Sequence, residues 1–83
     1  MLLITNNNIT DVRSGDYVYI QGRWDTVLCV ERCREYHELM LANQFFDFRD
    51  MKSSYYQLPA DKSIACYLAE TEEEIMQAKL SCC

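Results

Sequence analysis

Two runs of β-forming residues flank a glycine in the first half of the chain. Segment 16–30 is rich in Tyr, Val, Ile, Trp and Thr, and Gly22 lies near its centre. Glycine adopts the positive φ angles that tight reversals need, so this pattern predicts a β-hairpin. With residues 21–23 as its loop, the two-residue alternation of a strand places one set of side chains on the core-facing side: Val18, Ile20, Trp24, Leu28 and Val30.

Segment 31–44 contains many good helix formers, but strand pairing explains its pattern better. With Asn43 and Gln44 as a two-residue turn, Glu38 would face Arg49 across a second hairpin. The same register collects the apolar side chains on one face: Leu39, Leu41, Phe46 and Phe48. We therefore expect strands here, with a helix over 31–44 as the alternative.

Shorter strands are expected near both ends of the chain. Residues 1–4 are apolar, and segment 54–58 has strand composition and ends at Pro59. Apolar residues alternate over 64–69, which favours a last strand, although Pro59 could also open a helix through this region.

A capping box marks the start of a C-terminal helix. Thr71 is followed three residues later by Glu74, so the hydroxyl and the carboxylate can each accept a hydrogen bond from the other residue's backbone amide. Three carboxylates occupy the first turn and Lys79 lies near the end, as the helix dipole favours. At about ten residues the helix is too short to persist alone, so we expect it to dock on the sheet or on a partner.

These elements predict a small α+β domain, mainly β, that spans residues 1–83. The run Val-Arg-Ser-Gly-Asp-Tyr-Val-Tyr-Ile, residues 12–20, resembles the opening strand of SH3-like small barrels, in which a Gly-Asp step precedes the first long strand. The expected fold is thus a partly open SH3-like barrel or a twisted antiparallel sheet, with a helix at about residues 71–81.

Charge and cysteine content narrow the partners and the compartment. The chain has 13 acidic and 8 basic side chains, a net charge of −5, which repels nucleic acid and anionic membranes and favours a protein partner with a basic surface. No apolar run approaches the roughly 20 residues that span a bilayer. Five cysteines, an odd number, and the absence of a secretion signal predict the reducing cytoplasm. A homodimer is one way for so small a core to gain stability.

Metal and thiol chemistry has one candidate constellation. Cys29, Cys33 and His37 follow one another with three intervening residues each time, and Cys66 could add a fourth zinc ligand. Structural zinc sites usually present pairs of ligands on tight turns, whereas Cys29 is expected in a strand. Cys33 with His37 is likewise the one candidate for a nucleophilic pair, but the chain has no phosphate-binding loop and no nucleophile elbow. We expect no metal, no cofactor and no enzyme activity.

The expected function is therefore binding. Six tyrosines, one Trp and three Phe exceed what so small a core obviously needs, and aromatic side chains often anchor protein interfaces. The predicted partner-binding residues combine aromatic and acidic side chains: Tyr17, Tyr19, Asp47, Asp50, Tyr55, Tyr56 and Asp61.

In size and charge the chain resembles small phage proteins that block bacterial defence nucleases, including anti-CRISPR proteins. The resemblance implies a non-enzymatic inhibitor of a nucleic-acid-handling protein. A zinc- or thiol-dependent protein is one alternative. The other is a nucleic-acid-binding small barrel that uses five arginines: Arg13, Arg23, Arg32, Arg34 and Arg49.

Overall fold

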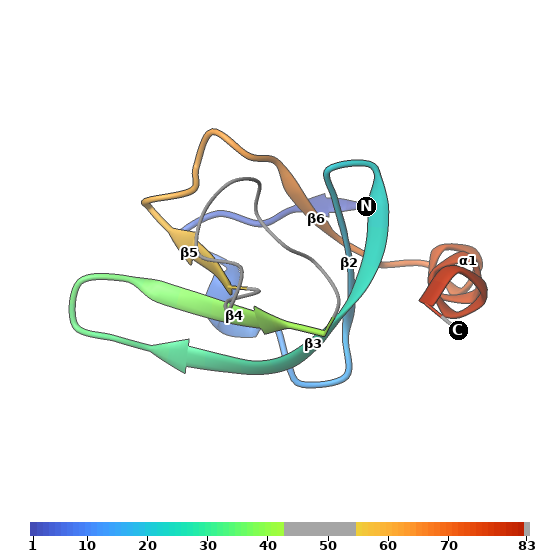
Figure 1. Cartoon of the computed structure of the whole chain (residues 1–83), viewed down its shortest axis with the longest axis horizontal. Coiled ribbons are helices and arrows are strands. Elements are labelled where there is room, and N and C mark those ends of the chain that lie inside the picture. The colour runs from blue at the N-terminus through green and yellow to red at the C-terminus, as the bar shows by residue number, and fades with distance from the viewer. Residues whose placement is uncertain (43–54, 83) are drawn as a thin grey trace.

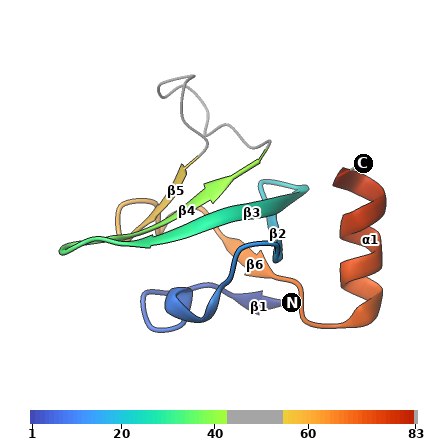
Figure 2. The same cartoon turned by 90° about the horizontal axis from the view of Figure 1, so that it is seen from below.

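In the part of the chain that the structure describes, residues 1–42 and 55–82, six antiparallel strands form one curled sheet, and an α-helix packs outside it (Figures 1 and 2). This computed structural model orders the strands β1-β6-β2-β3-β4-β5. Their bounds are β1 Leu2–Leu3, β2 Tyr17–Ile20, β3 Arg23–Arg32, β4 His37–Leu41, β5 Tyr55–Leu58 and β6 Cys66–Leu68; a 3-10 turn, η1, spans Ile9–Asp11 and the helix α1 spans Glu72–Cys82. The result is a curled half-barrel, which confirms the mainly β fold with a C-terminal helix.

The hydrophobic core fills the inside of the curl. Alternate residues of β2, β4 and β5 point inward, so Leu39 and Leu41 of β4 are both buried, as predicted. The other core residues are Ile4, Ile9, Val12, Val18, Ile20, Val27, Tyr56, Leu58 and Cys66.

Strands rather than helices occupy the two ambiguous segments. Within 31–44, β3 ends at Arg32 and β4 pairs with both β3 and β5. Within 59–70 the chain forms a turn and then β6. The predicted turn at 43–44 and the pairing of β4 with Phe46 and Phe48 lie outside the described residues.

The β2–β3 hairpin has a two-residue loop, which corrects the predicted register. Gln21 and Gly22 both have positive φ, 52° and 79°, as in the type I′ turns that match the twist of paired strands. Tyr19 therefore faces Trp24. Because a one-residue shift moves each side chain to the opposite face, Asp25 and Val27 are buried in place of the expected Trp24 and Leu28.

The Trp24 ring lies on the outer face of this hairpin instead of in the core. Trp24 is half-buried and packs edge-on against Tyr19, with ring centroids 5.0 Å apart and planes at 63°. Leu28 is 48% exposed. Placing Trp24 and Leu28 in the core was wrong because the prediction assumed a loop one residue too long.

A β-bulge in β3 shifts the alternation of inward and outward side chains by one residue, so that beyond the bulge it again matches the prediction. The pairing with β4 shifts between Val27, which faces Leu41, and Cys29, which faces Met40. One extra residue on a strand changes which side chains point inward beyond it. Val30 is consequently packed against the core, as the sequence predicts.

The edge of the sheet at β1 is capped by the side chain of Asn8. Ile4 N–H donates to the Cys66 carbonyl in β6, 2.8 Å away, so the backbone groups of Leu3 and Thr5 point away from β6. The Asn8 Nδ2 donates to the Leu3 carbonyl at 2.9 Å, and its Oδ1 accepts from Thr5 N–H at 2.7 Å. One amide side chain thus takes both positions that an added strand would use.

The opposite edge, at β5, is capped by Asp61. Gln57 N–H donates to Asp61 Oδ2 at 2.8 Å, and Asp61 N–H donates to the Gln57 carbonyl at 2.7 Å. The turn after β5 therefore satisfies the backbone of its own strand, and Asp61 is buried by doing so.

Candidate functional site

The start of α1 has the hydrogen bonds of the predicted capping box. Glu74 N–H donates to Thr71 Oγ1 at 3.1 Å, and Glu74 Oε1 accepts from the backbone N–H of Thr71 at 3.2 Å and of Glu70 at 2.9 Å. Three backbone donors at the helix start are satisfied by two side chains. The position at which α1 begins is therefore set locally, by Thr71 and Glu74.

The same carboxylate connects α1 to the first residue of the chain. Glu74 Oε2 accepts a 2.8 Å hydrogen bond from the Met1 α-amino group, which also lies 3.6 Å from Glu70 Oε1. The bond from Met1 is the largest cause that lowers the pKa of Glu74 to about 2, followed by the bond from the backbone of Glu70. In turn, the bond to Glu74 raises the pKa of the Met1 amino group. Because β1 holds Met1 beside β6, this pair fixes the N-terminal end of the helix.

One side of α1 packs on β2 and β3, outside the curl of the sheet (Figure 2). The partly or fully buried residues Ile75, Ala78 and Cys82 are spaced by three and four, so they share a helix face. Ala78 is completely buried and is not part of the core cluster. A small residue at this position lets the helix backbone lie close to the strands.

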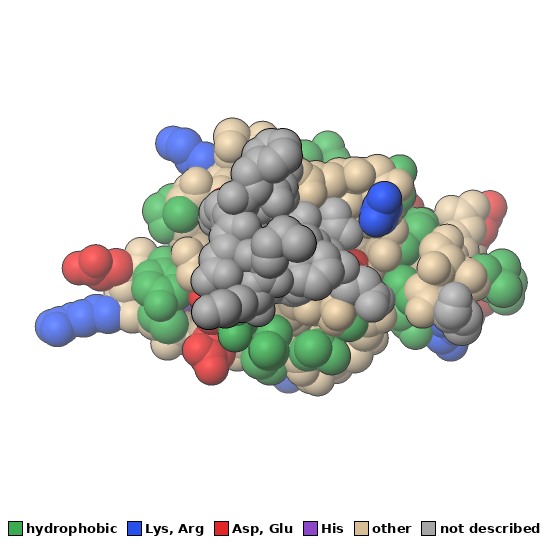
Figure 3. Space-filling model, viewed as in Figure 1, with side chains coloured by type: hydrophobic (Ala, Val, Ile, Leu, Met, Phe, Trp, Pro, Cys, Tyr) green, Lys and Arg blue, Asp and Glu red, His purple; other side chains and the backbone are tan. Residues whose placement is uncertain are grey.

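The other side of α1 exposes apolar residues to solvent. Met76 is 64% exposed and Leu80 is 76% exposed, and they lie one turn apart on the same face. Glu72 and Glu73 precede them by one turn and are exposed too. We call these four residues the α1 ridge; Figure 3 shows hydrophobic side chains projecting from α1 at the right-hand end of the molecule. A protein surface with an apolar centre and acidic flank is thus presented on a docked helix.

Two of the predicted partner-binding residues are buried. Tyr56 is 1% exposed and donates a 2.6 Å hydrogen bond from its hydroxyl to the Ile64 carbonyl; burial is the main cause that raises its pKa. Asp61 is 5% exposed and caps β5. Both side chains are structural, which corrects the prediction that they lie on a partner-binding surface.

The remaining predicted residues do not form one surface in the described structure. Tyr17 and Tyr19 are half-buried on the outer face of β2, beside α1. Tyr55 is half-buried on β5, and β3 and β4 lie between that strand and β2. Asp47 and Asp50 lie outside the described residues.

Sequence reasoning missed the α1 ridge, although a signal for it exists. Ile75 and Met76 differ by about 100° around a helix, so one docked face cannot contain all the apolar residues of α1.

Two of the five arginines predicted for nucleic-acid binding lie together in the described structure. Arg13 and Arg32 line a surface hollow of about 370 Å³ together with Thr10, Ser14 and Cys29. Arg23 and Arg34 lie elsewhere: Arg23 begins β3, and Arg34 lies between β3 and β4. Arg49 is outside the described residues.

The cysteine and histidine constellation has no arrangement suited to a metal over residues 1–42 and 55–82, where no group of three or more candidate ligands occurs. The neighbouring Cys33 thiol is the main cause that raises the pKa of Tyr36. Burial, and then the nearby Asp25, raise the pKa of the Cys66 thiol to about 12. Cys66 is therefore protonated near neutral pH, and a thiol is a poor ligand and nucleophile. The expected absence of metal, cofactor and enzyme activity stays a prediction.

Comparison with known proteins gives no match: no protein family, no curated protein and no solved structure matches the chain. No helix among the described residues has the length and apolar character needed to cross a membrane.

Proposed function

We propose that this protein is a non-enzymatic binding module whose α1 ridge inserts into an apolar groove with a basic rim on a protein partner. The observation that carries the proposal is the exposure of Met76 and Leu80, 64% and 76%, next to the carboxylates of Glu72 and Glu73. Helices commonly bind grooves through apolar residues spaced by three and four.

The energetics favour this use of the helix. Burying a large apolar side chain contributes about 1.5 to 3 kcal/mol, so leaving two of them in water on one ridge forgoes a substantial gain. The carboxylates at the ridge, within a chain of net charge −5, would attract a basic rim and speed association. Because α1 is already docked and capped, little ordering free energy would be lost on binding.

A nucleic-acid-handling protein is the class of partner that fits this charge. Its nucleic-acid site is basic, so an acidic ligand bound there would exclude the nucleic acid and act as an inhibitor, as phage anti-defence and anti-CRISPR proteins do. The four described cysteines are unpaired, which is consistent with the cytoplasm as the compartment. We expect the protein itself to bind nucleic acid weakly or not at all.

Site-specific crosslinking can identify the partner. A photoreactive phenylalanine analogue replaces Met76 in one variant and Leu28, an exposed apolar residue on the sheet, in a control variant. Each is expressed in native host cells, irradiated, and analysed by mass spectrometry. We expect a defined adduct with a basic nucleic-acid-handling protein from position 76 and none from position 28.

Binding of the purified partner then tests the surface itself. Met76→Ser with Leu80→Ser should weaken binding by at least about 30-fold, and Leu28→Ser should leave it within about threefold. Affinity should fall as salt rises, and competing DNA or RNA should displace the protein from its partner. Unchanged affinity of the double variant, salt-independent binding, or tight binding of the protein itself to nucleic acid would each overturn the proposal.

A further inference from the structure

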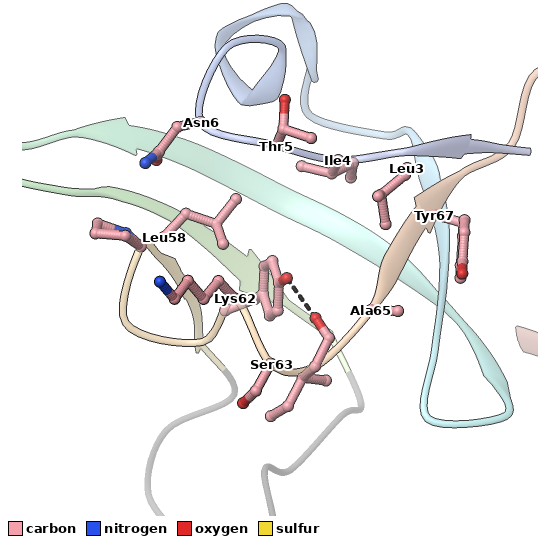
Figure 4. Close-up of a pocket in the computed structure, with 12 residues that line it drawn as sticks. Leu3, Ile4, Thr5, Asn6, Leu58, Lys62, Ser63, Ala65 and Tyr67 are labelled. Carbon is pink, nitrogen blue, oxygen red and sulfur yellow. Dashed lines mark hydrogen bonds between the residues drawn. The ribbon is translucent and has the colours of Figure 1, made fainter.

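A cavity of about 320 Å³ lies where the half-barrel stays open (Figure 4). Residues 3–6, in and after β1, line one side of it. Residues of β5, of β6 and of the turn between them line the other. We call it the seam pocket; its volume lies in the range of small-molecule sites.

Most of the lining is apolar, with a few polar groups. Leu3, Leu58 and Ile64 contribute apolar side chains, while Asn6 and Lys62 contribute an amide and an ammonium group. In Figure 4 the polar ends of Asn6 and Lys62 come from opposite walls and lie toward the same end of the pocket. An apolar body and a polar group could therefore be recognised by different parts of the pocket.

The charge in the seam pocket is opposite to that of the protein. No Asp or Glu is among the described residues that line it, and Lys62 makes no ion pair within the described ranges. The neighbouring Asp61 carboxylate accepts the Gln57 amide and does not line the pocket. A cation that has no ion pair among the described residues and lies beside an apolar cavity favours an anionic, partly apolar ligand.

The backbone around the seam pocket disfavours an extended peptide. Asn8 occupies the outward backbone groups of Leu3 and Thr5, and Asp61 occupies those of Gln57. A peptide could not pair with these groups as an added strand. The Tyr56 hydroxyl donates to the Ile64 carbonyl, so its proton is not free for a ligand either.

We propose that the seam pocket binds a small monocarboxylate with an aromatic or branched aliphatic body. The carboxylate pairs with the Lys62 ammonium and accepts a hydrogen bond from the Asn6 amide. The body packs against Leu3, Leu58 and Ile64. This site is independent of the α1 ridge.

Three small molecules test separately whether the carboxylate and the apolar body of the ligand contribute to binding. 3-Phenylpropionate has both features, 3-phenylpropionamide lacks the charge, and propionate lacks the ring. Each is titrated into the full-length protein and followed by backbone amide shifts in two-dimensional NMR. We expect saturable shifts at residues 3–6 and 58–67 with 3-phenylpropionate, and affinity at least about tenfold weaker for the other two.

Variants then test the role of Lys62. Lys62→Met should weaken binding of 3-phenylpropionate at least about tenfold, Lys62→Arg should retain it within about threefold, and Lys79→Met, which removes a lysine from α1, should have no effect. The spectrum of each free variant reports whether it is folded. Absence of binding at millimolar concentration, equal binding of the amide, shifts outside these residues, or equal loss in Lys79→Met would overturn the proposal.

Discussion

The inside of the half-barrel and the layer that α1 forms outside it differ in how they are stabilised. Inside, side chains from all six described strands or their flanks meet in one core, and the largest of them are fully buried. Outside, α1 contributes one completely buried residue, Ala78, and depends on hydrogen bonds at its first turn. The two regions therefore have different roles. The inner face determines the fold, whereas the outer layer presents a surface and adds little to the stability of the fold.

The largest expected effect is on the inner face. Leu39→Ala, at a fully buried position, should lower the free energy of unfolding by about 2 to 5 kcal/mol, because it removes apolar contacts and leaves a cavity. Urea denaturation followed by circular dichroism measures this loss. Trp24→Ala, in the outer layer, should cost less; an equal or greater loss for Trp24→Ala would contradict the distinction between the two layers.

An intermediate effect is expected at the helix cap. Thr71→Ala should cost about 1 kcal/mol, because the Glu74 amide loses its acceptor, and Thr71→Ser should restore most of it. Hydrogen exchange distinguishes the layers: the amides of α1 should exchange faster, while those of β4 keep their protection. Equal acceleration in β4 would mean that the helix and the barrel unfold as one unit.

The smallest expected effect is the pH dependence of the attachment of α1. The folded-state pKa of Glu74, about 2, lies below its ordinary 4.5, so its contribution is complete above about pH 4.5 and is lost as pH falls toward 2. The Met1 amino group has its pKa raised above 8.0, so its contribution is complete below pH 8 and is lost as pH rises through the raised value. The Glu74 side-chain carbon signal in NMR measures the first titration.

Glu74→Gln provides the control for this pH dependence. The variant should lose protection of the first α1 amides near neutral pH and show no further loss between pH 4.5 and 2 that depends on residue 74. A wild-type Glu74 that titrates near 4.5 would show that its bond with Met1 does not persist in solution.

Local patterns predicted much of this fold. The Thr71 and Glu74 pair placed the helix start, and the alternation of Leu39 and Leu41 identified β4 and its inner face. The register of the first hairpin was not predictable in this way, because the sequence is compatible with a loop of either two or three residues. The loop length decides whether Trp24 or Asp25 faces the core.

Contacts that exist only in the folded chain account for most of what the sequence left open. Asp61 reads as a solvated acid until the turn after β5 folds it onto Gln57. Likewise, which side of α1 docks depends on where β2 and β3 lie, so the exposure of Met76 follows from the packing rather than from the helix itself. The seam pocket needs both ends of the strand order in place before its walls exist.

The bulge in β3 has a consequence for how this chain can vary in length. Leu28 has an exposed side chain, and its carbonyl accepts a 2.7 Å hydrogen bond from Ser14 Oγ, a bond that any residue at position 28 could accept. Many substitutions there are therefore compatible with the fold. A deletion of Leu28 would remove the bulge and leave Cys29 opposite Met40 and Val30 opposite Leu39, so Val30 would still point toward the core. At this position a related chain could change its amino acid, or lose the residue altogether, without turning the core side chains of β3 outward.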